Sequence, residues 1–183
     1  MKLREMVQSG TTEDYLKALD YALEVGAESS WPVVKTMFGH SSPEVREAVI
    51  QAAVKLDVDG LGAFLVEAVA DLDANVGLTA LHSAGKLQTT EQNAVYGAAL
   101  RNGVEDVGIT AVAELEVEST HTAVNTMLQG LSSKNQEVRL ETRDTLEFLF
   151  DRPFTTNEEG VIWWEANRKN YDRDLIVKAD FVE

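Results

Sequence analysis

The segment PEVREAVIQAAVKL, residues 43–56, decides the fold. Its apolar side chains recur at spacings of three and four residues, which place them on one face of an α-helix. These side chains are Val45, Ala48, Val49, Ala52, Ala53 and Leu56. The next four residues, Asp57-Val58-Asp59-Gly60, are typical of a short turn, and the helical spacing resumes from Leu61 to Ala70. The segment therefore predicts two helices joined by a tight turn.

This helical pair is repeated along the chain with a period of 31 residues. Columns of apolar residues appear at that spacing: Val45, Val76, Val107 and Val138; Val69, Leu100, Leu131 and Ile162; Ala53, Ala84, Leu115 and Leu146. A further column of Ile50, Leu81 and Val112 ends at Arg143, and stepping back from Ile50 reaches Leu19. Several columns in one register are hard to attribute to chance, so they indicate repeated structure.

The period divides the chain into five repeats within one domain that spans residues 1–183. The repeats cover residues 11–40, 41–71, 72–102, 103–133 and 134–173. A pair of helices is too small to bury both of its faces, so neighbouring repeats must stack on one another. We therefore predict an all-α protein, a right-handed α-solenoid (superhelix) of about five two-helix repeats. The first helix of each repeat is expected outside, and the second is expected to line the inner face.

Residues that favour helix starts stand where the register requires them. Ser41-Ser42-Pro43-Glu44 combines capping hydroxyls with a proline suited to the first turn. Thr11-Thr12-Glu13-Asp14 is expected to open the first repeat in the same way. We also expect Ser29-Ser30-Trp31-Pro32 and Thr89-Thr90-Glu91-Gln92 to open second helices.

The segments PEVREA (residues 43–48) and QEVRLE (residues 136–141) resemble the first-helix signature of HEAT repeats. The short period is similar to that of the HEAT-like subclass that includes the phycobilisome lyase repeats. The third and fourth repeats depart from the signature, with Gly77 and Gly108 in place of the arginine. The end of the chain, with Trp163-Trp164-Glu165, is similar to that of many bacterial HEAT-repeat proteins, in which a Trp-Trp-Glu helix closes the array. The resemblance implies the fold but no particular function, because such folds serve many roles.

The chain carries 31 acidic and 16 basic side chains, a net charge of −15. This balance argues against nucleic acid as a partner, because binding to phosphates depends on Lys and Arg. It argues equally against an anionic membrane surface and favours basic partners. No window approaches the ~20 apolar residues of a membrane span, and the first residues have no apolar signal-peptide region. We therefore expect a soluble, cytoplasmic protein without membrane insertion, although a chain trimmed of its leader would look the same.

Motifs for catalysis or cofactor binding are absent from the sequence. The chain has no cysteine, and His40, His82 and His121 fall in different repeats without metal-ligand spacing. Asp57, Asp59, Asp71 and Asp73 are not arranged as a calcium-binding loop. We therefore predict no metal, no cofactor and no catalytic residue. The alternative, implied by the resemblance to lyase repeats, is a lyase-like or regulatory subunit that acts on a bound cofactor or enzyme.

The register also predicts a binding surface. With the core columns turned inward, Glu67, Ala98 and Gln129 form one exposed ridge, Ala63, Ala94 and Asn125 form the next, and Arg101 lies near the edge. We predict that Glu67, Arg101, Asn125 and Gln129 contact a partner on the concave inner face.

Two acidic runs point to the chemistry of that partner. Between Lys55 and Lys86, and again between Arg101 and Lys134, the only charged residues are acids. We therefore expect a basic protein or peptide, unless these runs are simply solvated. The predicted function is a non-enzymatic scaffold or adaptor, and Trp163 and Trp164 are expected to cap the core rather than to anchor a partner.

Overall fold

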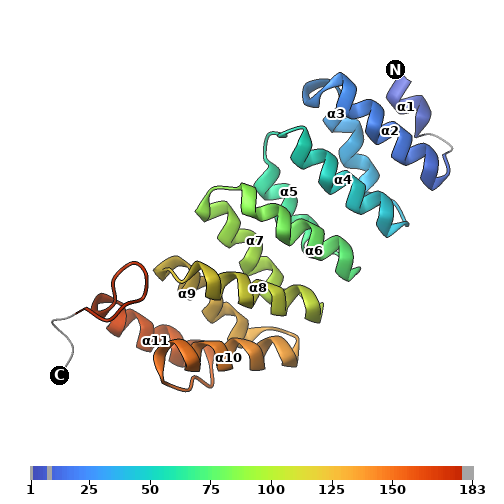
Figure 1. Ribbon diagram of the computed structural model, residues 1–183. Helices are drawn as coiled ribbons and strands as arrows, with labels where there is room; N and C mark the ends of the chain where they lie inside the picture. The colour runs from blue at the N-terminus through green and yellow to red at the C-terminus, as the bar shows by residue number, and fades with distance from the viewer. Residues whose placement is uncertain (1, 8–9, 179–183) are drawn as a thin grey trace. The chain divides into compact units, whose positions relative to one another are not determined.

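The computed structural model describes residues 2–7 and 10–178. In these residues the chain forms eleven α-helices and four short 3-10 helices, with no β-strand (Figure 1). The all-α prediction is confirmed. The chain divides into two compact units, residues 1–88 and residues 89–183. Within the described ranges no helix combines the length and apolar character that would let it span a bilayer.

The first unit is built from six α-helices and two short 3-10 helices within its described residues. They are α1 (Lys2–Met6), α2 (Thr12–Val25), α3 (Ala27–Val34), η1 (Lys35–Gly39), α4 (Pro43–Lys55), α5 (Leu61–Ala68), α6 (Ala74–Ser83) and η2 (Ala84–Lys86). Helix α4 packs against both α2 and α6, while α3 packs against α2 and α5 against α6. The core between them includes Val45, Ile50, Phe64 and Leu81, all buried.

The second unit is also built from first and second helices of successive repeats. Its helices are α7 (Thr89–Arg101), α8 (Glu105–Glu118), α9 (His121–Met127), η3 (Leu128–Ser132), α10 (Gln136–Phe150), α11 (Asn157–Asn167) and η4 (Arg168–Asn170). Helix α8 packs against α10, whereas α7 packs against α9 and η3, and η3 packs against α11. After η4 an antiparallel bridge joins Tyr171 to Val177.

The first residues of alternate α-helices follow the 31-residue period. Helices α2, α4, α6, α8 and α10 start at Thr12, Pro43, Ala74, Glu105 and Gln136, each 31 residues after the one before. The side chains of Val45, Val76, Val107 and Val138 are all completely buried. Helices α4, α6, α8 and α10 thus each place one buried valine of their first turn in the core of their own unit.

The capping predictions have mixed outcomes. Thr11 caps α2 in a capping box with Asp14, and α7 begins at Thr89, both as predicted. Helix α4 begins at Pro43 directly after Ser42, as predicted, but the Ser42 hydroxyl makes no capping hydrogen bond. The backbone N–H of Ser42 donates instead to Nδ1 of His40 (3.0 Å).

The second helix of the first repeat starts earlier than the sequence suggested. It begins at Ala27, because Gly26 adopts a positive φ of 86° directly after α2 and turns the chain there. The Ser30 hydroxyl donates to the carbonyl oxygen of Gly26 (2.6 Å) from inside the helix. Ser29 and Ser30 therefore belong to the body of α3 and do not cap it.

One core column does not continue to the last repeat. Val69, Leu100 and Leu131 are buried, but Ile162 is 65% exposed, so its predicted core position is wrong. The connection before α11 covers residues 151–156, and its length shifts the register of that helix. Helix α11 instead turns Asn157 and Gly160 toward η3: the Asn157 amide donates to the carbonyl oxygen of Leu128 (2.7 Å), and a Cβ at Gly160 would overlap Leu128.

Candidate functional site

The second helices of the second unit carry a surface of small and polar residues. Helix α7 exposes Ala94 and Arg101, and α9 exposes Asn125, while Ala98 and Gln129 are half-buried. The Arg101 guanidinium donates a hydrogen bond to the side-chain oxygen of Gln129, which joins α7 to η3.

Gly97 makes room for this hydrogen bond. A Cβ at that position would lie 3.2 Å from Oε1 of Gln129 and 3.3 Å from Nη1 of Arg101. The backbone of α7 is thus covered at this point by the two polar side chains. The structure therefore brings Arg101 and Gln129 together, with Asn125 one helical turn before Gln129.

Glu67, the fourth residue predicted for the partner site, lies on α5 in the first unit. It is exposed, and its carboxylate lies 4.0 Å from Nζ of Lys35 on η1. Both side chains are more than half exposed, so the pair contributes little to stability. The Glu67 carboxylate is therefore largely solvated.

The two acidic runs do not form a uniform acidic surface, because several of their carboxylates have structural roles. Asp71 receives two hydrogen bonds from Arg46, of 2.7 and 2.8 Å, and Asp73 caps α6. Glu118 accepts two hydrogen bonds from the Asn93 amide, both 3.2 Å long. The exposed acids of these runs are Asp57, Asp59, Glu67, Glu105 and Asp106.

Asp71 is held ionised by its surroundings. Burial alone would raise the pKa of this carboxyl, but hydrogen bonds from Arg46 and from the N–H of Asp73, with the Arg46 charge, lower it below the usual value. The residue therefore acts as the fixed partner of Arg46.

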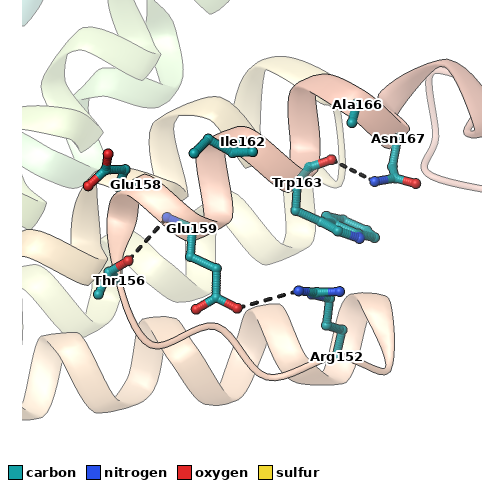
Figure 2. A pocket seen from close by; sticks show the side chains of 8 residues that line it. All are labelled: Arg152, Thr156, Glu158, Glu159, Ile162, Trp163, Ala166 and Asn167. Carbon is teal, nitrogen blue, oxygen red and sulfur yellow. Dashed lines mark hydrogen bonds and ion pairs between the residues drawn. The ribbon is translucent and has the colours of Figure 1, made fainter.

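A pocket of about 580 Å³ lies beside α11 in the second unit (Figure 2). Its lining consists of Arg152, Thr156, Glu158, Glu159, Ile162, Trp163, Ala166 and Asn167. Figure 2 shows Trp163 and Glu159 extending from α11 toward Arg152, on the connection that follows α10. The Arg152 guanidinium lies 5.7 Å from the centre of the Trp163 ring and 3.4 Å from Oε1 of Glu159.

The tryptophan pair is divided between two environments. Trp164 is 1% exposed and packs against His121, Phe150 and Tyr171, as expected of a cap. Trp163 is half-buried and forms a wall of the pocket. Adjacent residues project about 100° apart around a helix, so one ring can seal the core while the other meets solvent.

The sequence did not predict this pocket. Arg152, Glu159 and Ile162 come together because of the long connection before α11, which no repeat column predicts. Leu146 and Ile162 are as far apart in the sequence as Ala53 and Val69, so the columns gave no signal of this rearrangement.

The three histidines lie on different elements and have different neighbours. His40 packs on Tyr15 with ring centres 4.4 Å apart, His121 packs edge-on against Trp164 at 5.1 Å, and His82 is exposed on α6. In residues 2–7 and 10–178, no group of three or more His, Asp or Glu side chains is placed to hold a metal ion.

Comparisons of the chain with models of protein families, with curated proteins and with solved structures found no match.

Proposed function

We propose that the chain is a right-handed HEAT-like α-solenoid that acts without catalysis, as a scaffold or adaptor for a protein or peptide partner. Support for the repeat architecture comes from the five helix starts at 31-residue spacing and from the packing of α4 against α2 and α6 and of α10 against α8. Support for a binding role comes from one observation above all: the surface of α7, α9 and η3 exposes small and polar residues around the Arg101–Gln129 hydrogen bond.

The polar groups of this surface suit an extended peptide. Arg101 has five N–H donors and uses one of them on Gln129, so the others can meet backbone carbonyl oxygens of a partner. The amides of Asn125 and Gln129 can pair with peptide groups in the same manner. Small side chains at Ala94 and Ala98 let a backbone approach the helix closely.

The charge of the protein favours a basic partner. Exposed carboxylates occur on second helices in both units, with Glu67 on α5, Glu91 on α7 and Glu158 on α11. With a net charge of −15, the protein attracts a basic segment before contact is made.

Site-specific photo-crosslinking tests this proposal. A photoreactive residue at Asn125 is compared with one at Ala113, which is also exposed but lies on α8, the first helix of its repeat. In native lysate, position 125 should crosslink a protein that position 113 does not, and the yield should fall when the salt concentration is raised. Equal crosslinking at both positions would contradict a partner site on the second helices.

Charge-matched variants extend the test once a partner is identified. Asn125→Lys with Gln129→Lys adds two positive charges to the proposed site and should weaken binding at least tenfold. Ala113→Lys with Gln136→Lys adds the same charge to first helices and should change binding little. If both pairs weaken binding equally, only the net charge matters and the proposed surface is wrong.

A further inference from the structure

A second pocket, in the first unit, concentrates positive charge in this acidic protein. It has a volume of about 400 Å³ and lies between α4 and α6 on first helices, so it is separate from the proposed partner surface. Its lining residues are basic, polar or apolar and include no acid: Gln51, Val54, Lys55, Thr79, His82, Ser83 and Lys86.

The repeat register explains how these groups meet. Lys55 and Lys86 are the only Lys or Arg residues between Arg46 and Arg101, and they are 31 residues apart. Gln51 and His82 have the same separation. Because α4 packs against α6, residues one period apart lie side by side, and the two lysines converge on one groove.

The lysines have no acidic partner in the part of the chain that the structure describes. Neither Lys55 nor Lys86 forms an ion pair there. The register places Glu24 of α2 next to Lys55, but no ion pair joins them. Asp57, two residues after Lys55, lines a different pocket together with Trp31 and Pro32.

Two cationic side chains from neighbouring helices line this groove, and none of its lining residues is acidic. Lysine near a helix C-terminus complements the helix dipole, which accounts for each lysine separately. The dipole does not account for the Gln51 amide and the His82 ring, which line the same pocket. Like charges on neighbouring helices repel, and a bound anion would turn that repulsion into attraction.

We propose that this groove binds a compact multivalent oxyanion, specifically a phosphate group. The ammonium groups of Lys55 and Lys86 would donate charge-assisted hydrogen bonds to its oxygens, and the Gln51 amide and the His82 ring would supply further N–H donors. The volume of about 400 Å³ admits either inorganic phosphate or a small phosphorylated compound.

Titration of the full chain, followed by NMR of the backbone amides and of the His82 ring, tests the proposal. Inorganic phosphate and glycerol 3-phosphate are added separately, each against chloride at the same ionic strength. We expect saturable shifts confined to α4, α6 and η2, with a Kd on the order of 1 mM or tighter. Tighter binding of glycerol 3-phosphate identifies a phosphorylated small molecule as the source, whereas equal or weaker binding identifies the free ion.

A charge-matched variant separates the groove from net charge. Lys55→Gln and Lys86→Gln should each weaken phosphate binding at least fivefold. Lys134→Gln removes the same charge from an exposed lysine in the second unit and should leave the affinity unchanged. The proposal is overturned if neither phosphate nor its ester shifts the groove resonances more than chloride does, or if Lys134→Gln weakens binding as much as the groove variants.

Discussion

At the scale of single residues, Arg46 joins the connections on either side of its repeat. Its guanidinium holds Asp71 with two hydrogen bonds and also donates to the carbonyl oxygens of His40 (2.9 Å) and Ser41 (3.1 Å). Asp71 in turn accepts from the N–H of Asp73 (2.9 Å), the residue that caps α6. The side chains of Arg46 and Asp71 are only 15% and 9% exposed, so the ion pair is shielded from water.

Asp71→Asn should therefore lower the free energy of unfolding by about 3 kcal/mol at neutral pH, because it leaves the Arg46 charge shielded and unpaired. The pKa of Asp71 is lowered in the folded state, so its stabilising effect is full above the unfolded value of about 4 and is lost as the pH falls through the folded pKa. Urea unfolding at several pH values measures both effects.

The matched control is Glu13→Gln, which breaks the exposed ion pair with Lys17 and should change the urea midpoint very little. A wild-type advantage over Asp71→Asn that persists unchanged at pH 2 would contradict the role assigned to the ionised carboxylate.

Gly108 stands where two other repeats have an arginine, and packing explains the exchange. A Cβ at this position of α8 would overlap the side chain of Val138 on α10. Gly108→Ala should therefore cost about 1–3 kcal/mol through overpacking. Gly85→Ala is the control, because a Cβ there meets nothing within 4 Å, and its effect should stay within about 0.5 kcal/mol. Equal losses in urea unfolding would show that the contact with Val138 does not decide the result.

At the scale of elements, α11 illustrates how one helix can both close a core and leave a face open. Asn157, Gly160 and Trp164 lie on one side of it at spacings of three and four residues, and Asn157 and Gly160 meet η3. Ile162, Trp163 and Ala166 lie on the side that lines the pocket of Figure 2. The closing function therefore rests on Trp164, and Trp163 is available for other contacts.

Replacing the two tryptophans separately tests this division. Trp164→Ala removes a ring that is 1% exposed and should cost about 3–5 kcal/mol. Trp163→Ala removes a half-buried ring and should cost less than half as much. Chemical unfolding followed by circular dichroism gives both values, and a larger loss for Trp163→Ala would reverse the assignment.

The sequence predicted the helices well wherever the 31-residue columns extend. The bounds of α4 and α5 follow from the segment at residues 43–70 within two residues, because apolar periodicity reports directly on burial. It failed where the backbone departs from the period: Gly26 starts α3 early, and residues 151–156 shift α11. The pocket beside Trp163 depends on that shift, so no pattern of residue types could have placed Arg152 against it.

At the scale of the whole molecule, the excess of carboxylates should oppose compaction. Many of the 31 acidic residues are exposed, and the net charge of −15 raises the energy of any folded form in proportion to its compactness. Ion pairs in the described ranges involve only a minority of these acids. Screening by salt should therefore stabilise the protein, even though it weakens each exposed ion pair.

We expect the midpoint of thermal unfolding to rise when sodium chloride is increased from about 20 to about 300 mM. Across this range the Debye length falls from above to below about 10 Å, so the repulsion between carboxylates becomes screened. For a chain of this size, each kcal/mol gained corresponds to about 2–4 °C. Asp59→Asn with Glu147→Gln removes two exposed charges and should raise the midpoint at low salt while reducing its dependence on salt. A midpoint that falls with added salt would mean that local ion pairs, led by Arg46 and Asp71, outweigh the repulsion among the remaining acids.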